Sequence, residues 1–189
     1  VGHETAARQL ASAFRAGRLH HALLFTGPAG IGKTTLAFRL AFHLLRFPRA
    51  MTTAFCECAA NGGMEWGGAQ LEGVQFTQGM IHNMEYTGVM LRDLLAEAGV
   101  KPEGKWIYVE GHDASSNGRS IPLEKAMDDV MVAFFANGEA LRKEHGYPVR
   151  LVVPGWEGNM WIKWLRRIGV YDQAVESREE TSKYTDLMP

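Results

Sequence analysis

The feature that most constrains this chain is a change of pattern at Pro48. Before it, a glycine-rich loop at 27–34 lies between an apolar run at 21–26 and a helical pattern at 33–45. After it, short strand-like segments are broken by glycines. A proline ends a helix because it lacks an N–H donor and its ring crowds the preceding turn. We therefore predict two units, residues 1–48 and residues 49–189.

The loop at 27–34 reads Gly-Pro-Ala-Gly-Ile-Gly-Lys-Thr, the full spacing of a phosphate-binding loop. Backbone N–H groups and a helix N-terminus would bind phosphate there, and a threonine hydroxyl would bind Mg²⁺. The predicted nucleotide-binding residues are Gly27, Gly30, Gly32, Lys33 and Thr34. The prediction is ATP binding with Mg²⁺; the alternative is a fragment separated from the domain that used it. Asp128 and Asp129 precede an apolar run, so they are poor candidates for completing an ATPase site.

Residues 17–27, Gly-Arg-Leu-His-His-Ala-Leu-Leu-Phe-Thr-Gly, resemble the start of the delta-prime subunit of the bacterial DNA polymerase III clamp loader, an AAA+ protein. The resemblance covers residues 2–46. It implies a short α/β segment with the order helix, strand, loop, helix.

Composition excludes some classes of function. The formal net charge is −1, so bulk attraction to nucleic acid is not expected. No apolar run approaches the roughly 20 residues that cross a bilayer, so no membrane partner is expected. The N-terminus lacks a signal-peptide pattern, and we expect a cytoplasmic location for the chain as it stands. Cys56 and Cys58 are the only cysteines and are too close for an unstrained disulfide.

Beyond Pro48 the pattern predicts one helix, several strands and a turn. The helix runs over 87–98 and ends at Gly99. Asn137-Gly138 is typical of a hairpin turn. The polar tail at 176–189 is expected to be loosely held. The predicted strands cover residues 105–110, 130–135, 149–153 and 160–170.

Five motifs after the proline resemble the sulfite oxidase family, and within it the sulfane/sulfite dehydrogenases of bacterial sulfur oxidation. They are Glu-Cys-Ala-Ala-Asn-Gly at 57–62, the segments at 85–95, 117–123 and 145–155, and Lys-Trp-Leu at 163–165. The resemblance covers residues 51–189. It implies an α+β fold: an incomplete sulfite-oxidase-type molybdopterin domain core, preceded by the short α/β P-loop segment.

The resemblance implies roles for particular residues. Cys58 would be the molybdenum ligand, and a soft thiolate suits such a metal; the alternative is a cysteine that only packs. Arg150 and Lys163 lie in apolar segments, where an unpaired charge is costly; each could otherwise be a surface charge. The implied catalytic residues are Cys58, Asn117 and Arg119, and the implied cofactor contacts are Ser120, His145, Arg150 and Lys163.

The implied reaction is oxygen-atom transfer to sulfur by a molybdenum–molybdopterin cofactor, with electrons passed to a cytochrome c-type acceptor. Asn117 stands where animal sulfite oxidases have tyrosine, and Gly62 and Gly63 stand where they have basic residues. These differences favour protein-bound sulfane sulfur over sulfite as the substrate. Relatives of this type are periplasmic.

Two alternatives remain: an ATP-binding, clamp-loader-like module, or an inactive fusion fragment. A mis-joined reading frame near Pro48 would explain why one chain carries both patterns.

Overall fold

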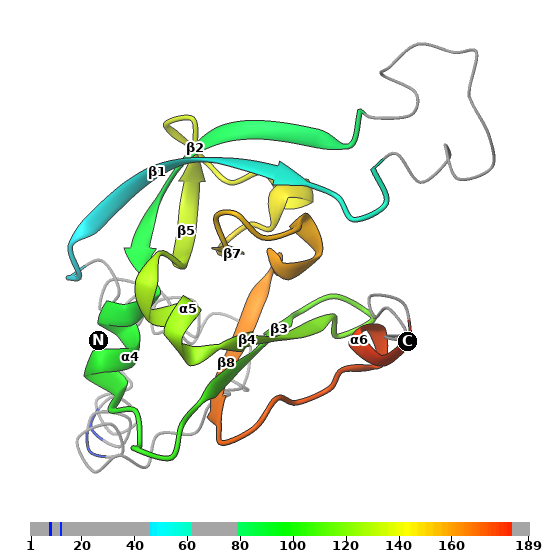
Figure 1. Cartoon of the computed structure of the whole chain (residues 1–189). Helices are drawn as coiled ribbons and strands as arrows, with labels where there is room; N and C mark the ends of the chain where they lie inside the picture. Colours follow the sequence, from blue (N-terminus) through cyan, green and yellow to red (C-terminus); the bar gives the residue numbers. More distant parts are fainter. Residues whose placement is uncertain (1–7, 9–11, 13–45, 62–78, 183–189) are drawn as a thin grey trace, which may run out of the picture.

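The structure is a computed structural model that describes residues 8, 12, 46–61 and 79–182. The described part is mostly β-structure, in two antiparallel sheets (Figure 1). The first sheet has the order β1 (Arg49–Glu57), β2 (Ile81–Met90), β5 (Met131–Ala136) and β6 (Glu139–Ala140), and β7 (Arg150–Val152) also pairs with β5. The second sheet has the order β4 (Gly118–Pro122), β3 (Trp106–Gly111) and β8 (Leu165–Tyr171).

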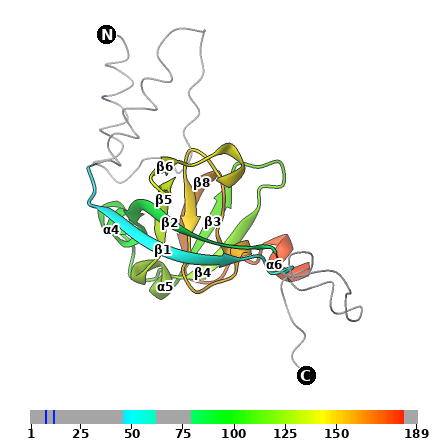
Figure 2. The same ribbon diagram turned by 90° about the horizontal axis from the view of Figure 1, so that it is seen from above.

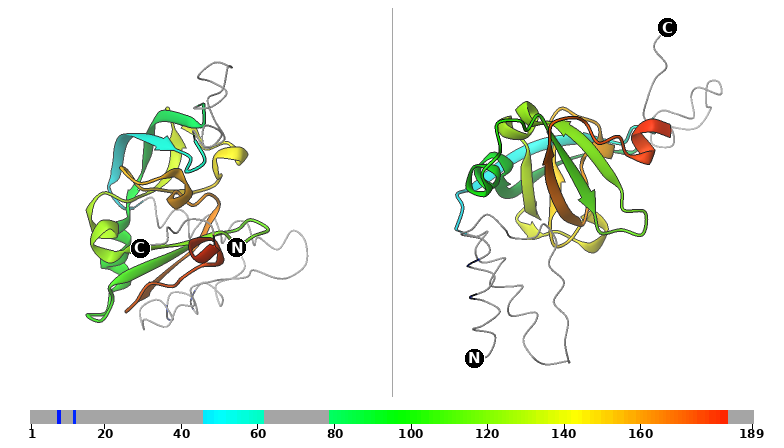
Figure 3. Two further views of the ribbon diagram at one scale, coloured as in Figure 1. Left: turned by 45° about the vertical axis from the view of Figure 1, so that its right-hand side comes forward. Right: turned by 90° about the horizontal axis from the view of Figure 1, so that it is seen from below.

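The described helices are short: α4 (Leu91–Ala98), α5 (Leu123–Asp128) and α6 (Arg178–Ser182), with 3₁₀ turns at Lys143–His145 and Gly158–Met160. Helices α4 and α5 lie together at one side of the sheets, and α6 lies at the other (Figures 1 and 3). Because the sheets dominate, the predicted α+β class is not confirmed. The predicted P-loop unit lies almost wholly outside the described residues.

Three predicted strands are confirmed as β3, β5 and β7, and so is the hairpin turn. Asn137 and Gly138 both have positive φ, 50° and 79°, which the tight turn between β5 and β6 requires. These features are local, because alternation and turn chemistry depend only on neighbouring residues.

Three other predictions are corrected. The helix predicted over 87–98 begins at Leu91, and Thr87, the predicted cap, lies within β2. The N–H of Leu91 donates to the carbonyl of Val130, so a tertiary contact replaces a side-chain cap. Met160 ends a 3₁₀ turn, and β8 starts only at Leu165. Part of the tail that was expected to be loosely held forms α6, which begins with a capping box between Ser177 and Glu180: each side chain accepts the other's backbone N–H.

One hydrophobic core joins the two sheets. It includes Ile107 and Ile121 from the second sheet and Met131 and Leu151 from the first, all fully buried. Each such side chain contributes roughly 1.5–3 kcal/mol relative to exposure. The long β1–β2 ribbon crosses the molecule from the α4 side to the α6 side (Figure 2). The end of β1 is thereby carried toward the candidate site.

Candidate functional site

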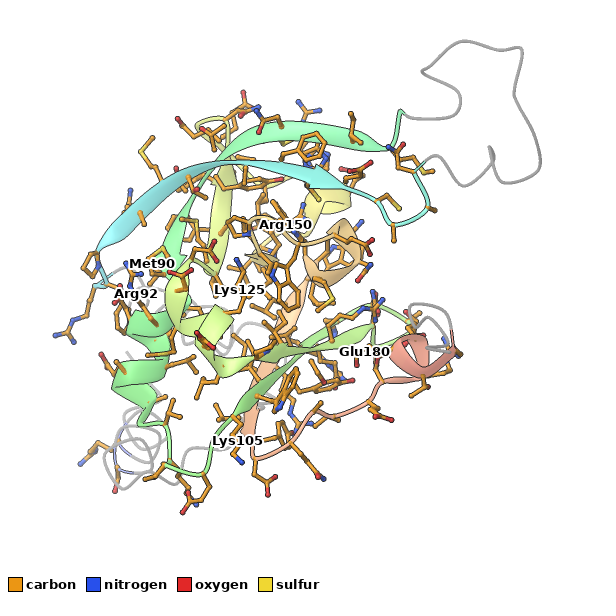
Figure 4. All side chains as sticks on the ribbon, viewed as in Figure 1. Met90, Arg92, Lys105, Lys125, Arg150 and Glu180 are labelled. Atoms are coloured by element: carbon orange, nitrogen blue, oxygen red, sulfur yellow. The ribbon has the colours of Figure 1, made fainter. Side chains whose placement is uncertain are left out.

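Arg150, the first residue of β7, is a buried cation with only 5% of its surface exposed (Figure 4). Its Nη1 donates to the carbonyl of His145 and its Nη2 to the carbonyl of Trp161, both at 3.3 Å. Its guanidinium carbon lies 5.7 Å from the ring centroids of Tyr86 and of Trp161. Within the described residues its Nε has no hydrogen-bond partner and no carboxylate pairs with it. Its charge is therefore held in place but not neutralised.

Neutral polar groups surround this cation. Cys56 faces His82 across β1 and β2, and His82 Nε2 lies 2.9 Å from the hydroxyl of Tyr86. Burial raises the pKa of Cys56 and of Tyr86 and lowers the pKa of His82; the nearby Arg150 charge lowers all three pKa values. Burial also lowers the pKa of Arg150 itself. We call Cys56, His82, Tyr86, Arg150 and Trp161 the Arg150 group.

Cys58 follows the last residue of β1 as an exposed free thiol. Its N–H donates to the carbonyl of Met80 at 3.0 Å, and its own carbonyl accepts from the N–H of Asn61 at 2.8 Å. The Asn61 side chain donates to Glu57 and accepts from the N–H of Met80. The backbone on both sides of Cys58 is thus fixed, while the thiol remains accessible.

His145 and Lys163 lie beside the Arg150 group. Lys163 Nζ donates to the carbonyl of Glu144 at 2.9 Å and lies 4.5 Å from the ring centroid of Trp164. At Gly146, where φ is +103°, a Cβ would be 2.9 Å from Lys163 Cβ, so the turn that carries His145 packs directly on Lys163. The structure therefore brings together the predicted residues His145, Arg150 and Lys163.

Asn117 and Arg119 form a second group with Asn159. Arg119 is 1% exposed, and its Nη1 donates to Asn117 Oδ1 at 2.8 Å and to the carbonyl of Gly118 at 2.7 Å. Its Nε donates to Asn159 Oδ1 at 3.4 Å. We call Asn117, Arg119 and Asn159 the Arg119 group.

A cavity of about 600 Å³ adjoins the Arg119 group. Ser120 also lines it, but the bonds of Ser120 run to the C-terminal segment: its N–H donates to Glu180 Oε1 at 2.6 Å and its hydroxyl to the carbonyl of Val175. Ser120 is thus not brought to the Arg150 group. The lining residues are Trp106, Arg119, Ser120, Gly155, Trp156, Glu157, Asn159, Met160, Ala174, Glu176 and Glu180.

Five residues of these two groups were not among the predicted site residues: Cys56, His82, Tyr86, Asn159 and Trp161. His82 and Tyr86 lie on the same side of a strand, a period-two pattern that the predicted helix start at Thr87 obscured. Asn159 and Trp161 lie between two recognised motifs, and no local pattern distinguishes them.

The predicted nucleotide residues Gly27, Gly30, Gly32, Lys33 and Thr34 lie outside the described residues. In the part of the chain that the structure describes, no group of three or more His, Cys, Asp or Glu side chains could hold a metal ion. Among the described helices, none has both the length and the apolar character that a membrane span needs.

Among the described residues, a buried cation without a counter-charge lies near a strand that ends in an accessible thiol, an arrangement suited to an anionic cofactor that carries a thiolate-bound metal. The chain belongs to the oxidoreductase molybdopterin binding domain family, whose model matches residues 29–179. That range begins before the boundary predicted at residue 48, which stays a prediction.

Sulfite oxidase from Gallus gallus is 36% identical over 171 residues, covering 85% of this chain and 37% of that protein. The mitochondrial sulfite oxidase of Drosophila melanogaster is 36% identical over 151 residues, covering 75% of this chain and 26% of that protein. The crystal structure of the sulfane dehydrogenase SoxCD from Paracoccus pantotrophus matches with a TM-score of 0.76 and 84% identity, covering 79% of this chain and 38% of that chain. This chain thus spans well under half the length of these relatives. None of these matches supports the clamp-loader resemblance or ATP binding.

Proposed function

We propose that this chain is the molybdopterin-binding part of a molybdenum oxidoreductase of sulfite/sulfane dehydrogenase type, which transfers an oxygen atom to sulfur. The observation that carries the proposal is the guanidinium of Arg150, buried and without a counter-charge among the described residues. Burial of an uncompensated charge is costly unless a ligand pairs with it. The similarity to sulfane dehydrogenase supports the same function.

The residues present fit the cofactor. Arg150 still has an unpaired Nε donor for a phosphate oxygen, and Lys163 and His145 lie beside it. Arginine and lysine are the usual donors to phosphate. Cys58 offers an accessible sulfur ligand on a fixed backbone. When bound, the cofactor would supply the redox and oxygen-transfer chemistry, and the protein would supply binding and orientation.

Arg119 is the group we propose for holding the sulfur substrate. It lines the cavity and is held by Asn117 and Asn159, so its charge can attract an anionic sulfur group. The cavity lining also contains three carboxylates, Glu157, Glu176 and Glu180. Their charge weighs against a free sulfite dianion and supports sulfane sulfur carried by another protein, as the preferred substrate. We propose a cytochrome c-type protein as the electron acceptor.

The test is the ratio of molybdenum to protein in chain purified from a host that makes the cofactor. A ratio near one supports the proposal. Reduction of cytochrome c with sulfite or with a protein persulfide then distinguishes the two substrates. A chain that folds but contains no molybdenum would refute cofactor binding by this segment.

A further inference from the structure

The 3₁₀ turn Gly158–Met160 connects the parts of the candidate site. Internal hydrogen bonds hold it: Met160 N–H donates to the carbonyl of Glu157 at 2.9 Å, and Trp161 N–H to the carbonyl of Gly158 at 3.1 Å. The turn lies between the Cys58 end of β1, the Arg119 group and the Arg150 group. A shift of this turn would therefore change its contacts with all three parts.

Gly158 lets the turn pack directly against the backbone of β1. A Cβ at this position would lie 2.8 Å from the carbonyl oxygen of Glu57 and 3.0 Å from Cys56 Sγ. The first contact is with backbone, which cannot rotate away, and Glu57 is the residue directly before Cys58. Glycine is needed here for space. Any side chain would separate the turn from the strand that carries the thiol.

Asn159 reaches from the turn to Arg119. Its Oδ1 accepts from Arg119 Nε at 3.4 Å, and its Nδ2 donates to Glu157 Oε2 at 2.7 Å. Both ends of the amide are used, so the orientation of the amide is fixed. Asn117 holds the Nη1 side of the same guanidinium at 2.8 Å. The plane of the guanidinium is thus set from two elements, the approach to β4 and the turn.

Trp161 extends the turn to the Arg150 group. Its carbonyl accepts from Arg150 Nη2, its ring lies 5.7 Å from the guanidinium carbon, and its indole N–H donates to the carbonyl of Trp156 at 2.9 Å. The side chain is 2% exposed. One short turn therefore contacts both arginines of the candidate site.

We propose that Asn159 is a positioning residue: it fixes the guanidinium of Arg119 relative to Cys58, through the turn that Gly158 seats on β1. The role of Arg119 toward substrate rests on the proposed function. The positioning of its side chain does not, and can be measured without cofactor.

The direct measurement is hydrogen exchange of the Arg119 Nε–Hε group by ¹⁵N NMR of the cofactor-free chain, with the resonance assigned by its loss in Arg119→Lys. Asn159→Ala is expected to speed this exchange about tenfold, because a hydrogen bond from a charged donor is lost. Asn159→Asp keeps the Oδ1 acceptor and is expected to retain most of the protection. Gly158→Ala is expected to lose protection although Asn159 is still present. Equal exchange in Asn159→Ala and the unchanged chain would overturn the proposal.

The matched control is Asn137→Ala. Asn137 lies in the β5–β6 turn, where its Oδ1 accepts from the N–H of Glu85 at 3.0 Å. This substitution is expected to lower the unfolding temperature without changing the Arg119 resonance. If it changed Arg119 exchange as much as Asn159→Ala does, the effect would be general loosening and the positioning role would be refuted.

In molybdenum-loaded protein, Asn159→Ala is expected to raise KM for the sulfur substrate about tenfold, with kcat and molybdenum content near those of the unchanged chain. A loss of kcat alone would overturn positioning of a substrate-binding cation. If the unchanged chain oxidises nothing, the proposed function fails, while the exchange measurement still decides the role of Asn159.

Discussion

Replacing Arg150 by methionine separates the function of this residue from its contribution to stability. The two hydrogen bonds at 3.3 Å are long, so each contributes about 1 kcal/mol, and each ring contact contributes about 1 kcal/mol. Against this total of about 4 kcal/mol stands the cost of burying a guanidinium without a counter-charge, which is several kcal/mol. The favourable contacts and the cost of burying the charge nearly cancel in the free energy of unfolding, and a methionine side chain fills much of the same volume.

We therefore expect the unfolding temperature of cofactor-free Arg150→Met to lie within about 4 °C of the unchanged chain. Loss of charged hydrogen bonds to a phosphate should weaken cofactor retention by about 100-fold. The assays are thermal unfolding by circular dichroism and the molybdenum-to-protein ratio. Arg92→Met is the control for the same substitution away from the site. Arg92 lies in α4, and its Nη1 donates to the carbonyl of Asp128 at the end of α5, away from Arg150 (Figure 4). A drop above about 10 °C with unchanged molybdenum content would show that Arg150 is structural, and would refute the reasoning.

Three further predictions follow from particular contacts. Cys58→Ser should abolish sulfur oxidation and leave the unfolding temperature unchanged, since the thiol is exposed; turnover in the variant, measured by cytochrome c reduction, would exclude a thiolate ligand. The chain should lose stability as pH falls through 6.5, the ordinary pKa of histidine, because the pKa of His82 is lowered in the fold and the unfolded chain then binds more protons; His82→Gln should weaken this dependence, and an identical pH profile of the unfolding temperature would contradict it. Gly88→Ala should cost about 2 kcal/mol or more, because its Cβ would meet the carbonyl oxygen of Val132 between β2 and β5; denaturant unfolding with an unshifted midpoint would show that the strands can separate without cost.

The parts of the fold that sequence predicted are those set by neighbouring residues. The alternation in β3, the apolar run in β5, the Asn137-Gly138 turn and the stop at Gly99 are all set by neighbouring residues. Four strands, β1, β2, β4 and β6, were not among the predicted ones, and the pair β1 and β2 shows the reason. Met51 and Phe55 on β1 are more than half exposed, so their pattern does not mark a buried face. Pairing along the whole length of both strands holds them instead, and no local window contains both partners.

The candidate site shows the same division. The motifs named Cys58, Asn117, Arg119, His145, Arg150 and Lys163, and their roles stay predictions. Only the fold shows that the Arg150 guanidinium contacts the rings of Tyr86 and Trp161. It also shows that Asn159 accepts a hydrogen bond from Arg119, forty residues earlier in the sequence. Only the fold shows, too, that Ser120 is bonded to the segment before and within α6, and its role toward a cofactor stays a prediction.

The sequence by itself determined the family and the chemical types of the site residues, because motifs of fixed order carry both. The tertiary structure decided which of these residues meet, because their distances depend on strand register and on the packing of turns. Gly158 illustrates the difference. In the sequence it is one glycine among 21, and in the fold it is the place where a turn can touch the backbone of β1 beside Cys58.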